Sequence, residues 1–405
     1  MMKVMVLNAG SSSIKYKLYR TDTWRSVASG TLTRIGEPMG ELKCRWVAED
    51  GEEQGRSEAL PIPNHRVGLD RVVKGLTQNG VLADASELTA IGHRVVHGGE
   101  HFRNATLVDD AVVEVIRGLV PLAPLHNPAA LDGIEVAREL FPSLPQVAVF
   151  DNAFHQTMPP ESYRYAIPEY LYREHRVRRY GFHGTSHFYV AKRAAAMLGK
   201  PLAECNLITL HLGNGASATA VRAGESVDTS MGLTPLEGLV MGTRCGDIDP
   251  AIHFYLCRNA GMDTNTLDLL FNRQSGLLGL CGVNDMREIH RLAGEGDAKA
   301  ELAIGIFSHR LKKYLGAYYA ELGRVDAVVF TGGIGENDAE VRARTCADLE
   351  GLGIRLDADA NAAPGTGERA VSCADSPVKV LVIPTNEELE IAQQAYAVVQ
   401  GKGVG

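Results

Sequence analysis

Short apolar runs rich in β-branched residues recur along the chain, and nearly every run stops beside Gly, Asn or Asp. Runs of about four to eight such residues between turn residues predict buried strands. They occur at 4–7, 147–150, 207–210, 327–330 and 378–383. Helical patterns lie between them, so the chain is predicted to be an α/β protein whose chemistry lies at strand ends.

Two kinds of signal mark the starts of helices. A polar residue before a proline occurs at 127–128 and 249–250, and proline suits the first helical position because an N–H there would have no partner. A Thr three residues before a Glu, the capping-box spacing, occurs at 234–237 and 385–388. The second box predicts a helix that runs to about Val399.

Residues 4–19 and 207–221 share one pattern. Each reads as a strand, a Gly/Ser/Asn turn and an alternating second strand, which is typical of a β-hairpin that could wrap phosphates. The repetition indicates two related domains with a boundary near Asp151. The polar stretch 49–58 is predicted to be a surface loop.

Composition narrows the class of protein. The 405 residues suffice for about two or three domains. A net charge of −8 argues against sequence-independent binding of nucleic acid, which needs a dense basic surface. No apolar run approaches the ~20 residues that cross a bilayer, and the apolar start is too short for a signal peptide. Seven scattered cysteines without a C-x-x-C pair suit a reducing compartment, so we expect a cytoplasmic protein without a membrane partner.

Glycine-rich segments follow predicted strands at 8–15, 211–215 and 332–337, and the last leads into a helix predicted at Ala339. Backbone N–H groups can approach a ligand closely there, and the first segment adds hydroxyls and Lys15. No lysine precedes Ser or Thr, which excludes a P-loop. Each cluster alone could be an ordinary tight turn. Together they favour a nucleotide held between two domains.

Arg94 and Arg244 both lie among glycines, where a buried guanidinium can hold a carboxylate or phosphate at two points. The alternative for either is a solvated surface arginine. His183 could donate a hydrogen bond to a transferring phosphoryl group, whereas its i, i+4 spacing with His187 leaves a metal pair open, although no HExxH glutamate is present. His126 precedes an expected helix and is either a site residue or structural.

Two carboxylates are candidates for a metal site. Asp151 follows a predicted strand, and Glu387 lies in the first turn of the last helix. Magnesium is commonly held by one or two carboxylates plus nucleotide phosphates. Asp151 could instead cap a turn, and Glu387 could only stabilise the helix N-terminus, an effect of roughly 0.3 to 1 kcal/mol.

A set of motifs, in order from end to end, makes the chain resemble the acetate kinases. They are NAGSSSIK, HRVVHGG, APLHNP, FHQTMP, YGFHGTSH, HLGNGAS, DTSMGLTPLEGL, GTRCGDIDP, TGGIGEN and IPTNEEL. Several are shared with propionate kinases of the same family.

The resemblance implies two similar RNase H-like α/β domains of the sugar kinase, heat-shock ATPase and actin superfamily, with the active site in the interdomain cleft. The N-terminal domain would span 1–151 and be completed by a returning helix within 387–405. The nucleotide-binding domain would span 152–386. A cytoplasmic homodimer would use Mg²⁺, or Mn²⁺ in its place, to transfer the γ-phosphoryl group of ATP reversibly to acetate, giving ADP and acetyl phosphate.

Carried over by motif, the resemblance assigns four sets of residues. The catalytic set is Arg94, His126, Asp151, His183 and Arg244, of which Arg94 also binds substrate. The metal ligands are Asn8 and Glu387. The ATP-binding set is Ser12, Lys15, His211, Leu212, Gly213, Asn214, Gly215, Asp285, Met286, Arg287, Gly333, Ile334, Gly335, Glu336 and Asn337. The apolar pocket for the methyl group is Val96, Leu125, Phe182 and Pro235.

Physical chemistry agrees with this reaction. A carboxylate with a pKa near about 4.3 is ionised at neutral pH, so the acceptor needs no general base. Bringing an anion to a polyanion demands cations and hydrogen-bond donors aimed at the γ-phosphoryl group. The arginines, the histidines and magnesium would supply them.

The chain departs from the family pattern in three places. Cys245 and Asn152 stand where serine and threonine are expected. The segment 281–284 is one residue short before Asp285, so how tightly the adenosine end of ATP is bound stays an open question. Two alternatives also stay open. One is a kinase for another acid such as propionate, since one methylene is worth only about 1 to 3 kcal/mol. The other is a non-catalytic ATP-dependent switch of the same superfamily.

Overall fold

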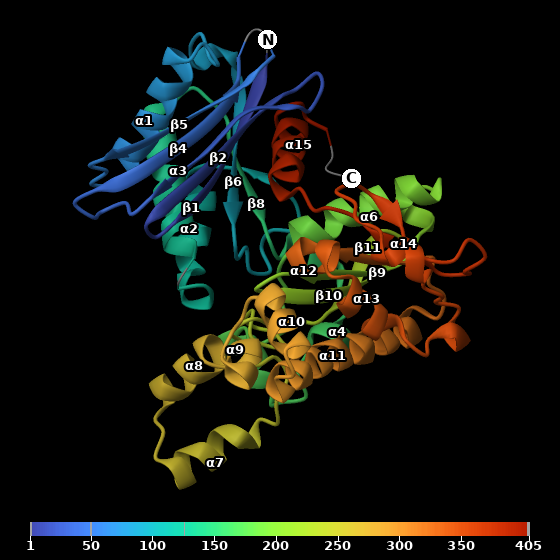
Figure 1. The fold of residues 1–405 in the computed structure, drawn as a ribbon. Coiled ribbons are helices and arrows are strands. Elements are labelled where there is room, and N and C mark those ends of the chain that lie inside the picture. Colours follow the sequence, from blue (N-terminus) through green and yellow to red (C-terminus); the bar gives the residue numbers. More distant parts are fainter. Residues whose placement is uncertain (1, 49–50, 125, 403–405) are drawn as a thin grey trace. The chain divides into compact units, whose positions relative to one another are not determined.

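A computed structural model describes residues 2–48, 51–124 and 126–402. The chain divides into two compact units. Unit 1 comprises Met1–Gln156 and Asn386–Gly405, and unit 2 comprises Thr157–Thr385. Figure 1 labels the elements of both.

Unit 1 contains an eight-stranded sheet in the order β5-β4-β3-β2-β1-β6-β8-β7. Its centre is parallel, because β1 pairs with β6 and β6 with β8 in the same direction, whereas β2 to β5 continue as antiparallel neighbours. The strands are β1 (Lys3–Gly10), β2 (Ser13–Arg20), β3 (Ser26–Thr33), β4 (Gly40–Val47), β5 (Glu53–Leu60), β6 (Leu88–Val95), β7 (Thr106–Leu107) and β8 (Gln146–Phe150).

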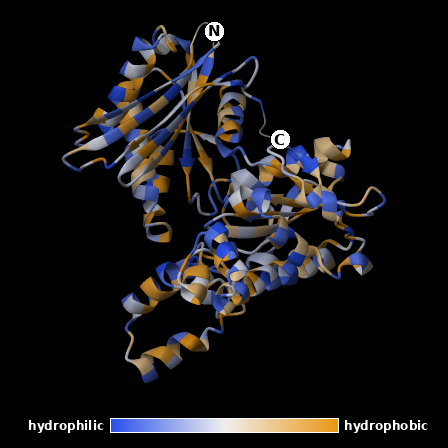
Figure 2. Ribbon diagram, viewed as in Figure 1, coloured by the Kyte–Doolittle hydropathy of each residue, from blue (hydrophilic) through white to orange (hydrophobic). Residues whose placement is uncertain are grey.

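Helices cover both faces of the central strands of unit 1. They are α1 (His65–Gln78), α2 (Asp110–Gly118), α3 (Asn127–Leu140) and α15 (Glu387–Val399). Successive side chains of β1 alternate between these layers: Val4 and Val6 pack with α15, while Met5 and Leu7 belong to the core under α1 and α3. Figure 2 shows both hydrophobic and hydrophilic segments on α1 and α3, as expected for helices with one buried face.

Unit 2 contains a six-stranded sheet in the order β11-β10-β9-β12-β14-β13. The strands are β9 (Asn206–Leu212), β10 (Ala216–Arg222), β11 (Glu225–Thr229), β12 (Ala327–Thr331), β13 (Arg369–Ala370) and β14 (Lys379–Val382). Every residue of β12 is buried, which requires packing on both faces of the sheet.

The helices of unit 2 include α6, which packs on β9 and β12, and α11, which packs on β9 and β10. The full set is α4 (Pro160–Tyr163), α5 (Glu169–His175), α6 (Gly184–Leu198), α7 (Ala251–Ala260), α8 (Thr264–Arg273), α9 (Gly276–Cys281), α10 (Met286–Gly294), α11 (Ala298–Leu322), α12 (Gly332–Asn337), α13 (Ala339–Cys346) and α14 (Ala358–Ala362).

The two sheets share one local strand order. In unit 1 it is β3-β2-β1-β6-β8, and in unit 2 it is β11-β10-β9-β12-β14. In each, the first strand of a hairpin pairs antiparallel with the second and parallel with the next strand along the chain. The predicted repetition of hairpins and the predicted α/β class are therefore confirmed.

All the predicted strands form, and helices begin at 127, 251 and 339, each within one residue of the expected start. Three details of the prediction were wrong. The last helix is capped by Asn386, whose side chain accepts from Leu389 N, instead of by Thr385. No helix follows Thr234, because the Glu237 carboxylate is bound by Arg179. Within the predicted loop at 49–58, residues from Glu53 onward belong to the exposed strand β5.

Among the residues described, no helix combines the length and the apolar character that crossing a bilayer requires.

Candidate functional site

Three charged side chains meet in unit 1. Arg94 stands near the end of β6, Asp151 directly follows β8, and Glu387 opens α15. Arg94 donates from Nε to both Asp151 oxygens at 3.1 and 3.0 Å and from Nη2 to Oδ2 at 2.6 Å. Its Nη2 also lies 4.0 Å from Glu387 Oε2. We call Arg94, Asp151 and Glu387 the unit 1 cluster.

Electrostatics in the unit 1 cluster follow from this pairing. The Asp151 carboxylate, at 2% exposure, raises the pKa of the Arg94 guanidinium, so Arg94 is held as a cation. Burial raises the pKa of Glu387 to about 7, and Asp151 and Glu388 add to the rise while Arg94 opposes it. Two carboxylates around one arginine thus leave an excess of negative charge that a further cation would relieve.

The hairpin of β1 and β2 brings Asn8 opposite Lys15. Asn8 is half-buried, and both Ser12 in the turn and Lys15 on β2 are exposed. A ring nitrogen of His65 lies 2.8 Å from Gly10 O and holds the end of β1, a contact that sequence reasoning missed because the two residues are far apart in the chain.

The remaining predicted residues of unit 1 lie on neighbouring segments. Val96 is half-buried just after β6. His126 is exposed and is itself the N-cap residue of α3, one position earlier than the cap that the sequence suggested at Asn127. Leu125 lies outside the described residues.

The donor set of unit 1 fits a hard divalent cation. Asn8, Asp151 and Glu387 offer amide and carboxylate oxygens, which Mg²⁺ and Mn²⁺ prefer. In the described ranges, no group of three or more His, Cys, Asp or Glu side chains is arranged to hold a metal. Two carboxylates suit an ion that takes its other ligands from phosphates and water better than they suit a closed structural site.

Histidines and hydroxyls meet in unit 2. His183 is the N-cap residue of α6 with φ +57°, and its Nδ1 lies 2.8 Å from Ser217 Oγ. The same hydroxyl lies 2.8 Å from His187 Nε2, while His187 Nδ1 lies 2.7 Å from Thr209 Oγ1. Because both ring nitrogens of His187 are hydrogen-bonded to hydroxyls, the spacing of His183 and His187 makes a hydrogen-bonded pair and not a zinc pair.

A third histidine completes this arrangement. The rings of His183 and His211 stack with their centroids 4.3 Å apart and their planes at 24°. His211 Nδ1 lies 2.8 Å from Ser186 Oγ. His183 is thus held on two sides, by Ser217 and by His211, which restricts the orientation of its ring.

Arg244 and His183 both lie beside Gly215. A Cβ built on Gly215 would lie 3.4 Å from Arg244 Nη1 and 3.6 Å from His183 Nε2. Arg244 Nη1 donates to Pro235 O at 3.2 Å and lies 3.6 Å from Met241 Sδ. We call His183, His187, His211, Ser217 and Arg244 the unit 2 cluster.

Among the residues that the structure describes, Arg244 has no close counterion: no carboxylate lies within 4.0 Å of its guanidinium nitrogens. Burial lowers the pKa of Arg244, and the nearby charge of Arg273 lowers it further. A half-buried guanidinium without a carboxylate can accept an anion as its partner. Phe182 is buried and Pro235 half-buried on segments adjoining this cluster.

A cavity of about 1150 Å³ opens in unit 2, which is ample for a nucleotide. Eight predicted ATP-binding residues line it: Gly213, Asn214, Asp285, Met286, Arg287, Gly333, Ile334 and Asn337. Leu212, Gly335 and Glu336 are not among the lining residues. His211 belongs to the unit 2 cluster, and Gly215 lies beside Arg244 and His183 of that cluster. The wall also includes residues that sequence reasoning missed, among them Asn284, His290, Asp338 and Glu340.

Glycine shapes the wall of this cavity. Gly332 has φ +77°, and a Cβ there would lie 2.7 Å from Leu212 O, so no side chain fits. A Cβ on Gly333 would meet no atom within 4 Å. The backbone of α12 can therefore approach a ligand closely. The Glu336 side chain turns back to the start of α12, where its Oε1 accepts from Gly332 N at 3.0 Å.

The shortened segment before Asp285 still closes onto the cavity. Asn284 Nδ2 donates to Asn214 Oδ1 at 3.2 Å, and Asp285 caps α10 by accepting from Arg287 N. The Arg287 side chain folds back onto Asp285, and this hydrogen bond lowers the pKa of Asp285 to about 2.

Comparison with known proteins decides the family. The chain matches the acetokinase family over residues 3–393. It belongs to the acetokinase family. It is 53% identical to the acetate kinase of Syntrophobacter fumaroxidans, with 100% of this chain and 98% of the relative covered.

Solved structures of the acetokinase family agree. A crystal structure of Porphyromonas gingivalis acetate kinase matches with a TM-score of 0.93 at 42% identity, covering 98% of this chain and 100% of the other. A propionate kinase from Francisella tularensis matches with a TM-score of 0.90 at 44% identity, covering 98% and 99%. The resemblance drawn from the motifs is therefore confirmed.

Proposed function

We propose that the chain is an acetate kinase, which transfers the γ-phosphoryl group of ATP reversibly to acetate and yields acetyl phosphate and ADP. The observation that carries this proposal is the half-buried Arg244, which has no carboxylate counterion among the described residues and lies with His183 beside Gly215, next to the nucleotide-sized cavity. A transferring phosphoryl group bears the charge that these two donors would stabilise. Membership of the acetokinase family supports the same reaction.

The acid acceptor explains why the site contains cations instead of a base. Acetate is ionised at neutral pH and attacks directly, so no proton must be removed. Asp151 is already bound by Arg94 at 2.6 Å, which suits a residue that orients a cation better than one that accepts a proton. Arg94 would bind the carboxylate of acetate, with Val96, Phe182 and Pro235 beside its methyl group.

Magnesium would bind Asn8 and Glu387, close to Asp151, with Mn²⁺ as an alternative ion. When bound, the ion would neutralise charge that develops on the phosphates. Asn8 and Glu387 would hold it, and Ser12 and Lys15 would bind phosphate oxygens. His126 would lie beside the transferring group. The base and ribose of ATP would occupy the unit 2 cavity.

Two properties follow the family and the composition. A cytoplasmic location suits seven free cysteines in a chain without C-x-x-C pairs. We also propose a homodimer, which sedimentation of the purified protein would test.

Trapping the acyl phosphate as its hydroxamate tests the proposal directly. Acetate with ATP and Mg²⁺ should give the hydroxamate at rates well above a control without acid. Intact ATP binding without an acetate-dependent signal would instead indicate a non-catalytic switch. Comparing kcat/KM for acetate, propionate and butyrate would decide whether propionate, favoured by the similarity to the Francisella tularensis enzyme, is the better substrate.

A further inference from the structure

Arg179 in unit 2 has no part in the proposed reaction, yet it binds several groups on separate segments of the chain. Its Nη1 donates to the backbone oxygens of Thr229 at 2.6 Å and Ser230 at 3.1 Å. Its Nη2 donates to Glu237 Oε1 at 2.7 Å. The side chain is only 16% exposed. One guanidinium thus ties the end of β11 to the loop that follows it.

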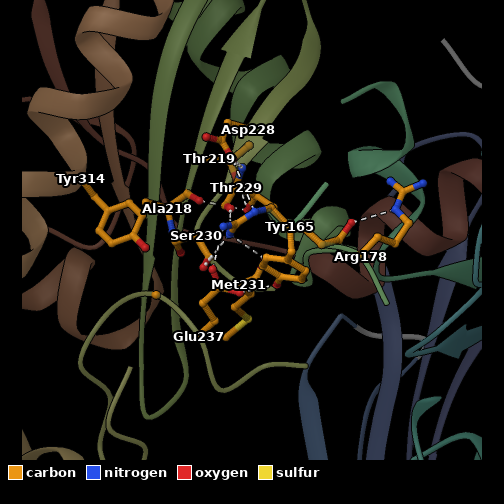
Figure 3. A network of polar contacts seen from close by, with 12 residues as sticks. Tyr165, Arg178, Ala218, Thr219, Asp228, Thr229, Ser230, Met231, Glu237 and Tyr314 are labelled. Carbon is orange, nitrogen blue, oxygen red and sulfur yellow. Dashed lines mark hydrogen bonds and ion pairs between the residues drawn. The ribbon is translucent and has the colours of Figure 1, made fainter. Parts of the chain in front are cut away.

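Glu237 has a second partner on the same side. The Tyr165 hydroxyl donates to Glu237 Oε2 and accepts from Leu233 N at 3.0 Å. Gly232 makes room for this pair, since a Cβ there would overlap the Glu237 carboxylate. Figure 3 shows Tyr165 and Glu237 beside the segment Ser230 to Met231. The start of the loop is therefore held by side chains from two other segments, Arg179 and Tyr165, which both bind Glu237 of the loop.

The far end of the loop is fixed independently. Asp247 Oδ1 accepts from Gly238 N at 2.8 Å, and Tyr314 donates to Asp247 Oδ2 at 2.8 Å. Arg310 donates to the carbonyl oxygens of Gly238 and Asp247 at 2.8 and 3.0 Å. Residues 230–247, which we call the Arg244 loop, are thus anchored at both ends.

The anchors at the start of the Arg244 loop lie next to both donors of the unit 2 cluster. Arg244 donates to Pro235 O at 3.2 Å, and Pro235 is two residues before Glu237. Arg179 is also four residues before His183 in sequence, and Tyr180 N between them donates to Gly232 O at 3.0 Å. Arg179 therefore couples the segment that leads to His183 to the loop that carries Arg244.

We propose that Arg179 and Glu237 form a positioning pair, which holds the Arg244 loop so that Arg244 and His183 stay aligned for phosphoryl transfer. This inference rests on the proposed function. Neither residue of the pair lines the nucleotide cavity as far as the structure describes it. Its loss should lower kcat and spare nucleotide affinity, because a displacement of about 1 Å can cost about 100-fold in rate.

The first experiment separates kcat from KM. Arg179→Met should lower kcat about 100-fold and change the KM for ATP less than about threefold. Arg179→Lys keeps the charge but not the fork that reaches Glu237 and the carbonyls together, so kcat should fall only about 10-fold. Arg193→Met is the matched control. Arg193, on α6, also binds a carboxylate at two points, with Glu368 oxygens at 2.5 and 2.8 Å, and removing this ion pair should leave kcat unchanged.

The second experiment asks whether the pair acts through Arg244. In an Arg244→Ala background, Arg179→Met should reduce kcat by less than about twofold more, since the group to be positioned is gone. If the double variant lost kcat by the product of the two single-variant factors, the inference would be overturned. An Arg179→Met enzyme that keeps its kcat, or one whose ATP affinity falls as much as its rate, would also overturn it.

Two safeguards keep the outcome clear. If Arg179→Met does not fold, Glu237→Gln retains the shape of the pair and should lower kcat about 10-fold, and an unchanged kcat would overturn the inference. The wild type is measured in the same hydroxamate assay. An inactive wild type would remove the proposed function and this inference together, whereas an active wild type with an equally active variant would remove the inference alone.

Discussion

The two units hold their site arginines in opposite ways. In unit 1, Arg94 is bound by Asp151 at 2.6 Å and lies 4.0 Å from Glu387, so two carboxylates surround one cation. In unit 2, Arg244 meets only a carbonyl oxygen and a thioether among the side-chain contacts described for it. One cluster is short of positive charge and the other is short of negative charge.

The difference shows what each cluster can accept. Burying a charge without a counterion is unfavourable, so the Arg244 environment gains most when an anion arrives. The unit 1 cluster gains most from a cation, because its second carboxylate is not neutralised by Arg94. A kinase that joins two anions with the help of a metal needs one environment of each kind.

The largest expected effect is on Arg244. Arg244→Ala should lower kcat about 1000-fold or more, since it removes a preorganised cation from developing charge, while the affinity for ADP changes little. Steady-state rates and ADP titration calorimetry measure the two quantities. Arg258→Ala, on the exposed helix α7, removes the same charge from unit 2 and should leave both unchanged. An equal loss of ADP affinity would mean that Arg244 binds nucleotide in the ground state.

In unit 1 the corresponding test is Asp151→Asn. We expect kcat to fall about 100-fold and the Mg²⁺ concentration for half-maximal rate to rise, because the cluster loses one of its two negative charges. Titration of the rate with Mg²⁺ measures both. Recovery of activity with an added external base would contradict this interpretation and revive a role for Asp151 as general base.

These contacts also show how far the sequence could lead. Apolar runs next to turn residues predict the central strands because those strands are buried on both faces. The exposed edge strand β5 has no such run, and only its pairing with β4 makes it a strand. The capping-box pattern at 234–237 failed for a related reason, since Arg179, far away in sequence, binds Glu237. Local signals cannot foresee partners supplied by the fold.

The site divides in the same way. Asp151 and Glu387 could be named because one follows a predicted strand and the other opens a predicted helix, and Arg94 because it lies among glycines. Ser217 was missed, since a serine on β10 after a glycine turn looks like an ordinary strand residue until α6 brings His183 and His187 to it. A signal did exist in the motif HLGNGAS, which ends on this serine.

Ser217 gives a smaller test of the unit 2 cluster. Ser217→Ala removes the hydroxyl shared by His183 and His187, and looser orientation of His183 should lower kcat about 10-fold without changing KM. Thr219→Val is the matched control: it lies two residues further on the same strand and loses a buried hydroxyl contact with Thr229 Oγ1 at 2.9 Å. Equal rates for the two variants would show that Ser217 contributes stability and no orientation.

The smallest effect concerns the buried histidines. His93 in unit 1, hydrogen-bonded to Gln146 Oε1 at 2.8 Å, has its pKa lowered to about 4 by burial. A histidine with an ordinary pKa of about 6.5 when unfolded then binds protons more readily in the unfolded state, so stability falls as the pH drops below that value. Between pH 7.5 and pH 6 the loss should be about 0.8 kcal/mol of unfolding free energy.

His93→Gln should remove this pH dependence. Urea unfolding at pH 7.5 and pH 6 measures the change in unfolding free energy with pH. This change is compared between the wild type and the variant, because the substitution also alters stability at every pH. His187, whose ring nitrogens contact the hydroxyls of Ser217 and Thr209, is the counterpart in unit 2. A variant whose unfolding free energy depends on pH as much as that of the wild type would show that His93 is not the group responsible. His187→Gln would then be tested in the same way.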